Sequence, residues 1–263
     1  MPTAEGKPIW FELNAADQDA AQAFYEAVAG WRITPSPMLE HGGYRVAEAD
    51  GMPVAGIRGS MPEAPGFPGW AVYLATLDVD AIASRVVELG GQIRFGPVDI
   101  PHVGRFAMVS DPQDVVFALM AATSPDESRA FGPVPLGTEQ TLGQGVWIEL
   151  ATPDPEAAFA FYGALFGWEK LGAMPMGGMG EYAFIGQGDL RPGAVMSSTA
   201  TEAPARWNWY VHVADIDATL ASVRERGGTV LQGPDPIPGG SYSAYIADPA
   251  GNRLGVAGPR QPA

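Results

Sequence analysis

The chain has 263 residues, a length that suits one large domain or two of ordinary size. It contains no cysteine, which excludes disulfides, thiolate nucleophiles and cysteine-ligated metal centres. Thirty acidic residues against 15 basic ones give a net charge of −15, which argues against nucleic acid and membrane surfaces as partners. With no leader-like start and no apolar run long enough to span a bilayer, the sequence predicts a cytoplasmic protein.

An internal duplication organises the chain. Residues recur at a constant offset of 137 positions, so that Trp10 and Glu12 return as Trp147 and Glu149. The segment 123–143 is polar and rich in Pro and Gly, as linkers are. The sequence therefore predicts two domains, residues 1–122 and 144–263, joined by a linker at 123–143.

The predicted elements of the first copy follow one rhythm twice. A strand at 9–15 alternates apolar and polar residues, and Asp17 then begins an alanine-rich helix that ends at Gly30. The remaining elements are strands near 31–34, 44–48, 54–58 and 70–77, a helix at 78–91, and strands at 92–96, 105–111 and 115–120. The second copy repeats this order, with helices at 154–167 and 215–227. The pattern predicts an α+β fold of paired βαβββ modules.

Each pair of modules is expected to form one curved mixed sheet with helices on its convex face. Alternation along the first strand turns Ile9, Phe11 and Leu13 toward the helices. The opposite, concave face then carries Trp10, Glu12, Trp147 and Glu149, and it is left open to bind a ligand.

Specific motifs resemble the vicinal oxygen chelate superfamily, which contains glyoxalases, bleomycin-resistance proteins and extradiol dioxygenases. The segments AFYEAVAGW (23–31) and AFYGALFGW (160–168) look like that family's first-helix signature. DPAGN at 248–252 matches its Asp-Pro-x-Gly-Asn signature in full, and DPQDV at 111–115 matches it in part. The resemblance covers nearly the whole chain twice, as in tandem two-domain glyoxalase-like members.

The resemblance also implies where a metal would bind, and the residues found there are unsuitable. The family's ligands are His or Gln, His, and Glu on the first, fifth and eighth strands. The matching positions here hold Trp10 and Trp147, Ala71 and Asn208, and Ala118 and Gly255. Because several His or carboxylate groups must converge on such an ion, we expect neither a metal nor another cofactor.

Aromatic residues at those positions predict a stacking surface for a planar ligand. The first pocket is apolar, with Val116 where the second copy has Arg253; the second adds a polar cluster, and the methionine-rich loop 174–180 is expected to act as its lid. The expected ligand-binding residues are Trp10, Glu12, Tyr73, Phe106, Met108, Met120, Trp147, Glu149, Met176, Asn208, Tyr210, Tyr245 and Arg253.

Alternative roles are open for Glu12, Glu149 and His212. Glu12 and Glu149 are general bases, acceptors of hydrogen bonds from a ligand amine or hydroxyl, or rim carboxylates paired with an arginine. His212 is either catalytic or a satisfied structural group. Trp70, Trp207 and Trp209 are expected to be structural.

The predicted function is metal-independent binding of an apolar, aromatic natural product or pathway intermediate, for sequestration, self-resistance or delivery to a biosynthetic partner enzyme. The rival hypothesis is a glyoxalase-, isomerase- or hydroxylase-like enzyme that uses Glu149, His212 or Tyr210 for proton transfer. A scaffold with vestigial pockets is a third possibility. We expect a monomer with its domains packed as a pseudo-dimer, or a weak homodimer.

Overall fold

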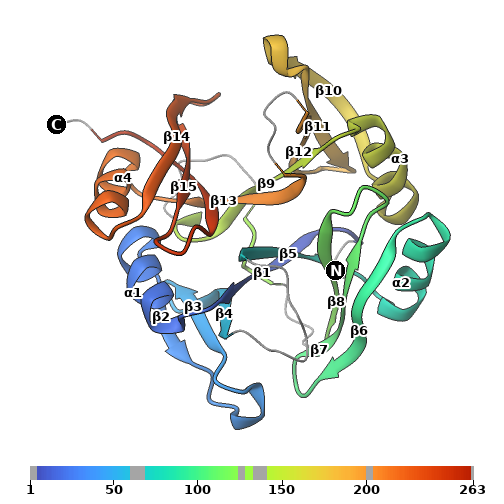
Figure 1. Cartoon of the computed structure of the whole chain (residues 1–263), viewed down its shortest axis with the longest axis horizontal. Helices are drawn as coiled ribbons and strands as arrows, with labels where there is room; N and C mark the ends of the chain where they lie inside the picture. The colour runs from blue at the N-terminus through green and yellow to red at the C-terminus, as the bar shows by residue number, and fades with distance from the viewer. Residues whose placement is uncertain (1–4, 60–68, 124–127, 133–140, 200–203, 262–263) are drawn as a thin grey trace. The chain divides into compact units, whose positions relative to one another are not determined.

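The computed structural model describes residues 5–59, 69–123, 128–132, 141–199 and 204–261 (Figure 1). The first copy contains β1 (Pro8–Ala15), α1 (Gln18–Ala29), β2 (Arg32–Pro35), η1 (Leu39–His41), β3 (Arg45–Ala49), β4 (Met52–Gly59), β5 (Gly69–Ala75), α2 (Val79–Glu88), β6 (Gln92–Ile100), β7 (Gly104–Ser110) and β8 (Val116–Ala122). The second contains β9 (Gly145–Thr152), α3 (Pro155–Phe166), β10 (Glu169–Pro175), η3 (Gly177–Met179), β11 (Glu181–Gln187), β12 (Leu190–Ser197), β13 (Arg206–His212), α4 (Ile216–Glu225), β14 (Thr229–Pro236), β15 (Tyr242–Ala247) and β16 (Arg253–Gly258).

Each copy contributes one eight-stranded mixed sheet, which confirms the predicted fold class. The strand orders are β2-β3-β4-β1-β5-β8-β7-β6 and β10-β11-β12-β9-β13-β16-β15-β14, so the duplication is exact at the level of topology. Strand β1 runs parallel to β4, and β5 runs parallel to β8, whereas β2-β3-β4 and β6-β7-β8 are antiparallel. None of the described helices is long and apolar enough to cross a bilayer.

Local sequence explains where the helices begin and end. Asp17, Asp78, Asp154 and Asp215 lie in extended backbone just before the four helices, and each carboxylate accepts a hydrogen bond from an amide of the first turn. Helices α1 and α3 end at Gly30 and Gly167, which adopt left-handed φ angles of 69° and 71°. These are the boundaries that the sequence predicts.

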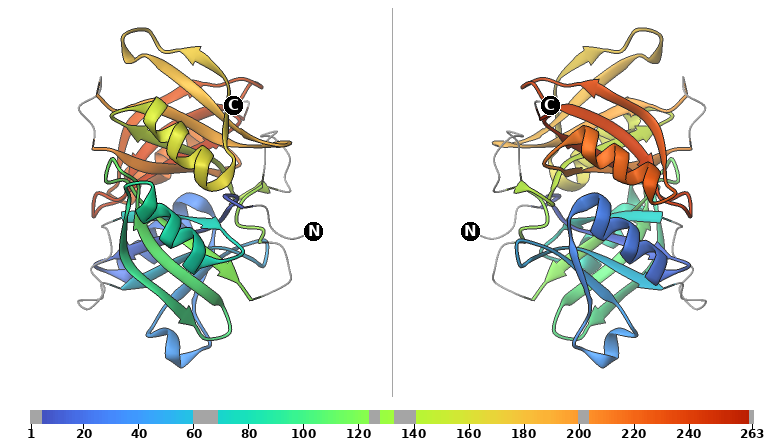
Figure 2. Two further views of the ribbon diagram at one scale, coloured as in Figure 1. Left: turned by 90° about the vertical axis from the view of Figure 1, so that its right-hand side faces the viewer. Right: turned by 90° about the vertical axis from the view of Figure 1, so that its left-hand side faces the viewer.

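The chain folds into two compact units, each of which combines one module of each copy. Unit 1 contains residues 1–9, 72–127 and 148–208, and unit 2 contains residues 10–71, 128–147 and 209–263. In unit 1 helix α2 lies beside α3, and in unit 2 helix α1 lies beside α4 (Figures 1 and 2). The predicted domain boundaries at 122 and 144 separate the two sequence copies. As boundaries of domains they stay a prediction.

The two signature motifs meet inside each unit, with the helix from one copy and the Asp-Pro loop from the other. In unit 2 the hydroxyl of Tyr25 donates to Asp248 over 3.1 Å and accepts from Trp70 Nε1 over 3.1 Å. In unit 1 Tyr162 donates to Asp111 over 3.2 Å and accepts from Trp207 over 3.1 Å. Burial, and then the neighbouring aspartate, raise the pKa of both tyrosines well above 10.0. The motifs are therefore structural, as are Trp70 and Trp207.

Part of the predicted linker is packed within unit 2. Ala130 and Phe131 are buried, and residues 130–132 pair through backbone hydrogen bonds with Gly145 at the start of β9. Phe11 lies 6.5 Å from Phe131 and stacks on Trp209 with ring centroids 3.8 Å apart. Trp209 is thus a core residue, as expected. Residues 124–127 and 133–140 of the predicted linker lie outside the described residues.

Candidate functional site

In unit 1, Glu149 occupies one face of the sheet formed by β10, β11, β12 and β9. The side chain is only 4% exposed, and the hydroxyl of Tyr182 on β11 donates to its Oε2 over 2.8 Å. The strand register places Met174 and Met196 beside Tyr182 on this same face. Helix α3 packs on β10 and β12. A buried carboxylate thus lies below partly exposed methionine and tyrosine side chains.

The equivalent glutamate of the first copy, Glu12, lies in unit 2 in a different environment. Arg58 on β4 approaches Glu12 to 3.5 Å, and Tyr44 also hydrogen-bonds it. Trp10 Nε1 in turn donates to the Tyr44 hydroxyl over 2.8 Å. Burial, followed by the charge of Glu12, raises the pKa of Tyr44 well above 10.0. The hypothesis of a carboxylate paired with an arginine therefore describes Glu12.

The same register shows why the two glutamates differ. Glu12 is paired with Gly56 and Asn14 with Arg58, while Glu149 is paired with Ala194 and Ala151 with Met196. Met196 thus stands where the first copy has Arg58. At position 56, a side chain would overlap the Tyr44 ring, so glycine is needed for Tyr44 to reach Glu12.

An aromatic cluster with one arginine is the candidate ligand site of unit 2, and we call it the Tyr210–Tyr245 surface; the two tyrosines are only 7% and 8% exposed, whereas Trp147 and Arg253 are half-buried. It consists of Trp147, Tyr210, Tyr245 and Arg253. The rings of Tyr210 and Tyr245 lie 5.2 Å apart, and the half-buried Trp147 packs against their cluster. Arg253 places its Cζ 3.9 Å from the centre of the Tyr245 ring.

The donor set does not fit a metal ion. Within the described ranges no three His, Asp or Glu side chains are grouped closely enough to hold one. Position 255, which aligns with the family's glutamate ligand, is a glycine, and a Cβ there would overlap the ring of Tyr210. The Tyr210 ring therefore fills the space into which a chelating side chain would project.

The expected apolar residues of the first pocket lie together in unit 1. Tyr73 and Phe106 stack with ring centroids 6.3 Å apart, and the register places Met108 and Met120 on neighbouring strand positions. All four are at most 8% exposed. Elsewhere in unit 1 Asn208 is buried as well, and Met176 is half-buried in the turn between β10 and β11.

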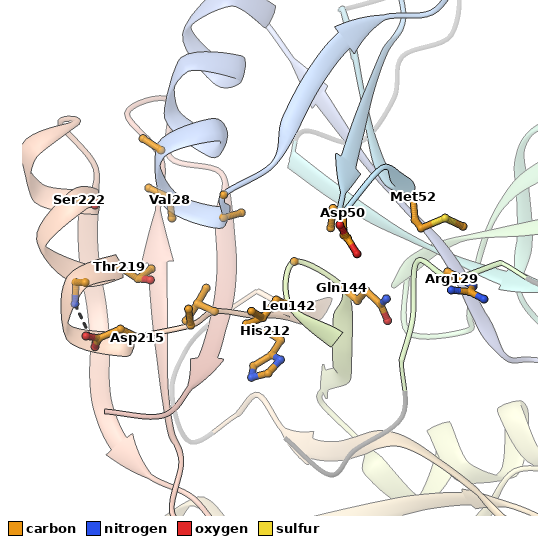
Figure 3. A pocket seen from close by; sticks show the side chains of 18 residues that line it. Val28, Asp50, Met52, Arg129, Leu142, Gln144, His212, Asp215, Thr219 and Ser222 are labelled. Carbon is orange, nitrogen blue, oxygen red and sulfur yellow. Dashed lines mark hydrogen bonds between the residues drawn. The ribbon is translucent and has the colours of Figure 1, made fainter. Parts of the chain in front are cut away.

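His212 lines a separate cavity of about 640 Å³ in unit 2 (Figure 3). The cavity lies between the last turn of α1, the turn at Asp50, residues 142–144 and the first turns of α4. His212 Nδ1 is 2.9 Å from the hydroxyl of Thr141, and its buried Nε2 has no hydrogen-bond partner in the described part of the chain. Burial lowers the pKa of His212 from 6.5, which favours the neutral ring at neutral pH.

The three predicted proton-transfer residues do not fall in one unit. Glu149 belongs to unit 1, whereas Tyr210 and His212 belong to unit 2. Sequence reasoning also missed Tyr44, Arg58, Tyr182 and Met196. A carboxylate on the first strand with a tyrosine on the third strand or directly before it, in both copies, was the available signal for the two tyrosines.

The chain belongs to the glyoxalase/bleomycin resistance protein/dioxygenase superfamily, whose family model matches residues 145–256. It is 34% identical over 258 residues to the "Putative glyoxylase CFP32" of Mycobacterium tuberculosis, which covers 97% of this chain and 95% of the relative. It is also 30% identical to the "Anthracycline biosynthesis protein DnrV" of Streptomyces peucetius, over 96% of this chain and 93% of the relative.

Solved structures share the fold at low sequence identity. A Mn(II)-bound glyoxalase from Novosphingobium aromaticivorans superposes with a TM-score of 0.64 at 16% identity, over 97% of this chain and 82% of that one. The 2,2',3-trihydroxybiphenyl 1,2-dioxygenase of Sphingomonas wittichii gives 0.61 at 14% identity, over 97% and 90%. These likenesses establish the architecture, and activity must be argued from the residues.

Proposed function

We propose that this chain is a metal-independent binding protein for a planar, largely apolar small molecule, and that the Tyr210–Tyr245 surface holds it. The observation that carries the proposal is the Tyr210 ring over Gly255, where the family's ligand position has become part of an aromatic surface. Trp147 beside it is half-buried, so it retains exposed surface on which a flat ligand can stack.

The relatives support a role in a biosynthetic pathway. Two of them are named anthracycline biosynthesis proteins, 31% and 30% identical over 96% of this chain. Anthracyclines contain a flat anthraquinone, which is the kind of ligand that an aromatic surface accepts. We propose that the protein sequesters such a compound or delivers it to a partner enzyme. The net charge of −15 favours ligands that also carry an amine at low salt.

Isothermal titration calorimetry with 1,4-dihydroxyanthraquinone tests the proposal, because it needs no tryptophan signal. Trp147→Ala should weaken binding roughly 10-fold, by analogy with aromatic–base stacking. Leu231→Ala, which removes a side chain 48% exposed on β14, is the control and should leave affinity within about twofold. Trp10→Ala reports whether the first copy contributes. Saturable binding unaffected by Trp147→Ala would rule out this surface.

An enzymatic function is the second candidate, since the superfamily includes glyoxalases and dioxygenases. The buried Glu149 with its 2.8 Å hydrogen bond from Tyr182 favours it, because a carboxylate and a phenol in contact can exchange a proton with a substrate. Chromatography of the bound compound after incubation separates the two functions. Conversion that Glu149→Gln abolishes, and that Glu12→Gln leaves intact, would establish the enzyme; an unchanged compound supports the binding protein.

A further inference from the structure

Arg253 differs from most arginines of this acidic protein. Ion pairs with Asp or Glu engage Arg32, Arg45, Arg58, Arg85, Arg94, Arg105 and Arg260. Arg253 has no such pair within the described residues, although the chain carries 30 acidic side chains. Its Nε is buried and lacks a hydrogen-bond acceptor in the described part of the structure. A buried N–H left in this state is costly, so an acceptor from a ligand would be favourable.

The surroundings hold Arg253 in place. Asp248, five residues earlier, accepts hydrogen bonds from the amides of Ala250 and Asn252 and from the side chains of Asn252 and Tyr25. This fixed loop leads directly into β16, of which Arg253 is the first residue. The Tyr245 ring, 3.9 Å from Cζ, then supports the guanidinium from one side. Such preorganisation reduces the entropic cost of binding.

We infer that Arg253 recognises an anionic oxygen, a carboxylate or an ionised phenol, on the planar ligand. The inference rests on the proposed function and adds the polar group of the ligand that the site would recognise. A planar guanidinium beside the tilted rings of Tyr210 and Tyr245 can bind a carboxylate of an aromatic ligand through two N–H groups. The first copy has Val116 at the equivalent strand position, paired with Ser110 as Arg253 is with Ala247. This specificity therefore belongs to the second copy.

A matched pair of probes tests the inference: anthraquinone-2-carboxylate and its neutral analogue anthraquinone-2-carboxamide, titrated by calorimetry. The carboxylate should bind about 10-fold more tightly than the carboxamide, a ratio typical of a hydrogen bond to a charged group. Arg253→Met keeps an apolar contact with Tyr245 and should reduce the ratio to about one. Arg253→Lys should retain part of the preference, because a lysine keeps the charge without the bidentate geometry.

Arg226→Met is the control, since it removes the same charge from an exposed position at the end of α4. It should leave the ratio unchanged. Equal binding of both probes to the unaltered protein would overturn the role of Arg253 while leaving the proposed function intact. A preference that survives Arg253→Met would do the same. If neither probe shows saturable binding, the inference and the proposed function both fail.

Discussion

Glu12 and Glu149 occupy equivalent positions of the two copies, yet their neighbours differ. Glu12 lies between Arg58 at 3.5 Å and Tyr44, in a network that also includes Trp10. Glu149 keeps the tyrosine, as Tyr182, but has Met196 where Arg58 would be. One substitution on a neighbouring strand thus separates a carboxylate with an arginine at that position from one with a methionine there. Equivalent positions of the two copies therefore need not have the same role.

Arg58→Met removes the difference between the two glutamate sites most directly, because it gives the first copy the residue type of the second. Glu12, whose side chain is only 12% exposed, then loses the arginine beside it, and the free energy of unfolding should fall by about 3 kcal/mol. Urea denaturation measures this. Arg32→Met, which removes the cation of a pair whose arginine is 68% exposed, should cost less than about 1 kcal/mol. Equal losses for the two variants would show that the Glu12 pair is energetically unimportant.

Tyr162→Phe and Tyr25→Phe test whether the two tyrosine–aspartate hydrogen bonds contribute equally to stability. Tyr162 is the donor to Asp111 Oδ2, whereas Asp248 Oδ2 also accepts from Asn252 Nδ2 over 2.7 Å. Removing the Tyr162 hydroxyl should therefore cost about 2 kcal/mol, and removing that of Tyr25 about 1 kcal/mol. Thermal unfolding of the two variants gives the order. A larger loss for Tyr25→Phe would mean that Asn252 does not compensate.

His212 has Ala75 as its counterpart in the first copy. Of the substitutions considered, replacement of His212 should have the smallest effect on stability. Burial lowers the pKa of His212 below 6.5, so at falling pH the unfolded chain takes up a proton first. The contribution of His212 to stability is present above pH 6.5 and is lost progressively as the pH falls below it. His212→Asn should flatten the pH dependence of unfolding below pH 6.5. An unchanged slope would indicate that His212 does not control it.

Much of the fold could be predicted from the sequence because its signals are local. The aspartates before the helices, Gly30 and Gly167 after two of them, and the alternation around Phe11 act over a few residues. The motifs at 23–31 and 248–252 also identified the superfamily correctly. Local patterns do not show which distant residues contact each other in the fold. No spacing in the sequence indicates that Tyr25 bonds Asp248, or that Arg58 rather than another arginine reaches Glu12.

The candidate site was predictable to the same extent. Alternation placed Trp10 and Trp147 on the ligand side of their strands, and that role stays a prediction. It could not show that Trp10 Nε1 already donates to Tyr44, because Tyr44 lies 34 residues further along the chain, directly before β3. Nor could it show that the Tyr210 ring covers Gly255, since a rotamer choice and a missing side chain together create that surface.

The pairing of each helix with the other copy's Asp-Pro loop has a consequence for synthesis. Unit 1 can be completed once residue 208 has left the ribosome, but unit 2 needs both the early segment 10–71 and the late segment 209–263. During translation, all of unit 1 is synthesised before Asp248, the hydrogen-bond partner of Tyr25, is added to the chain. The nascent chain is therefore expected to complete unit 1 first and unit 2 last, and α1 lacks its contact with α4 until then.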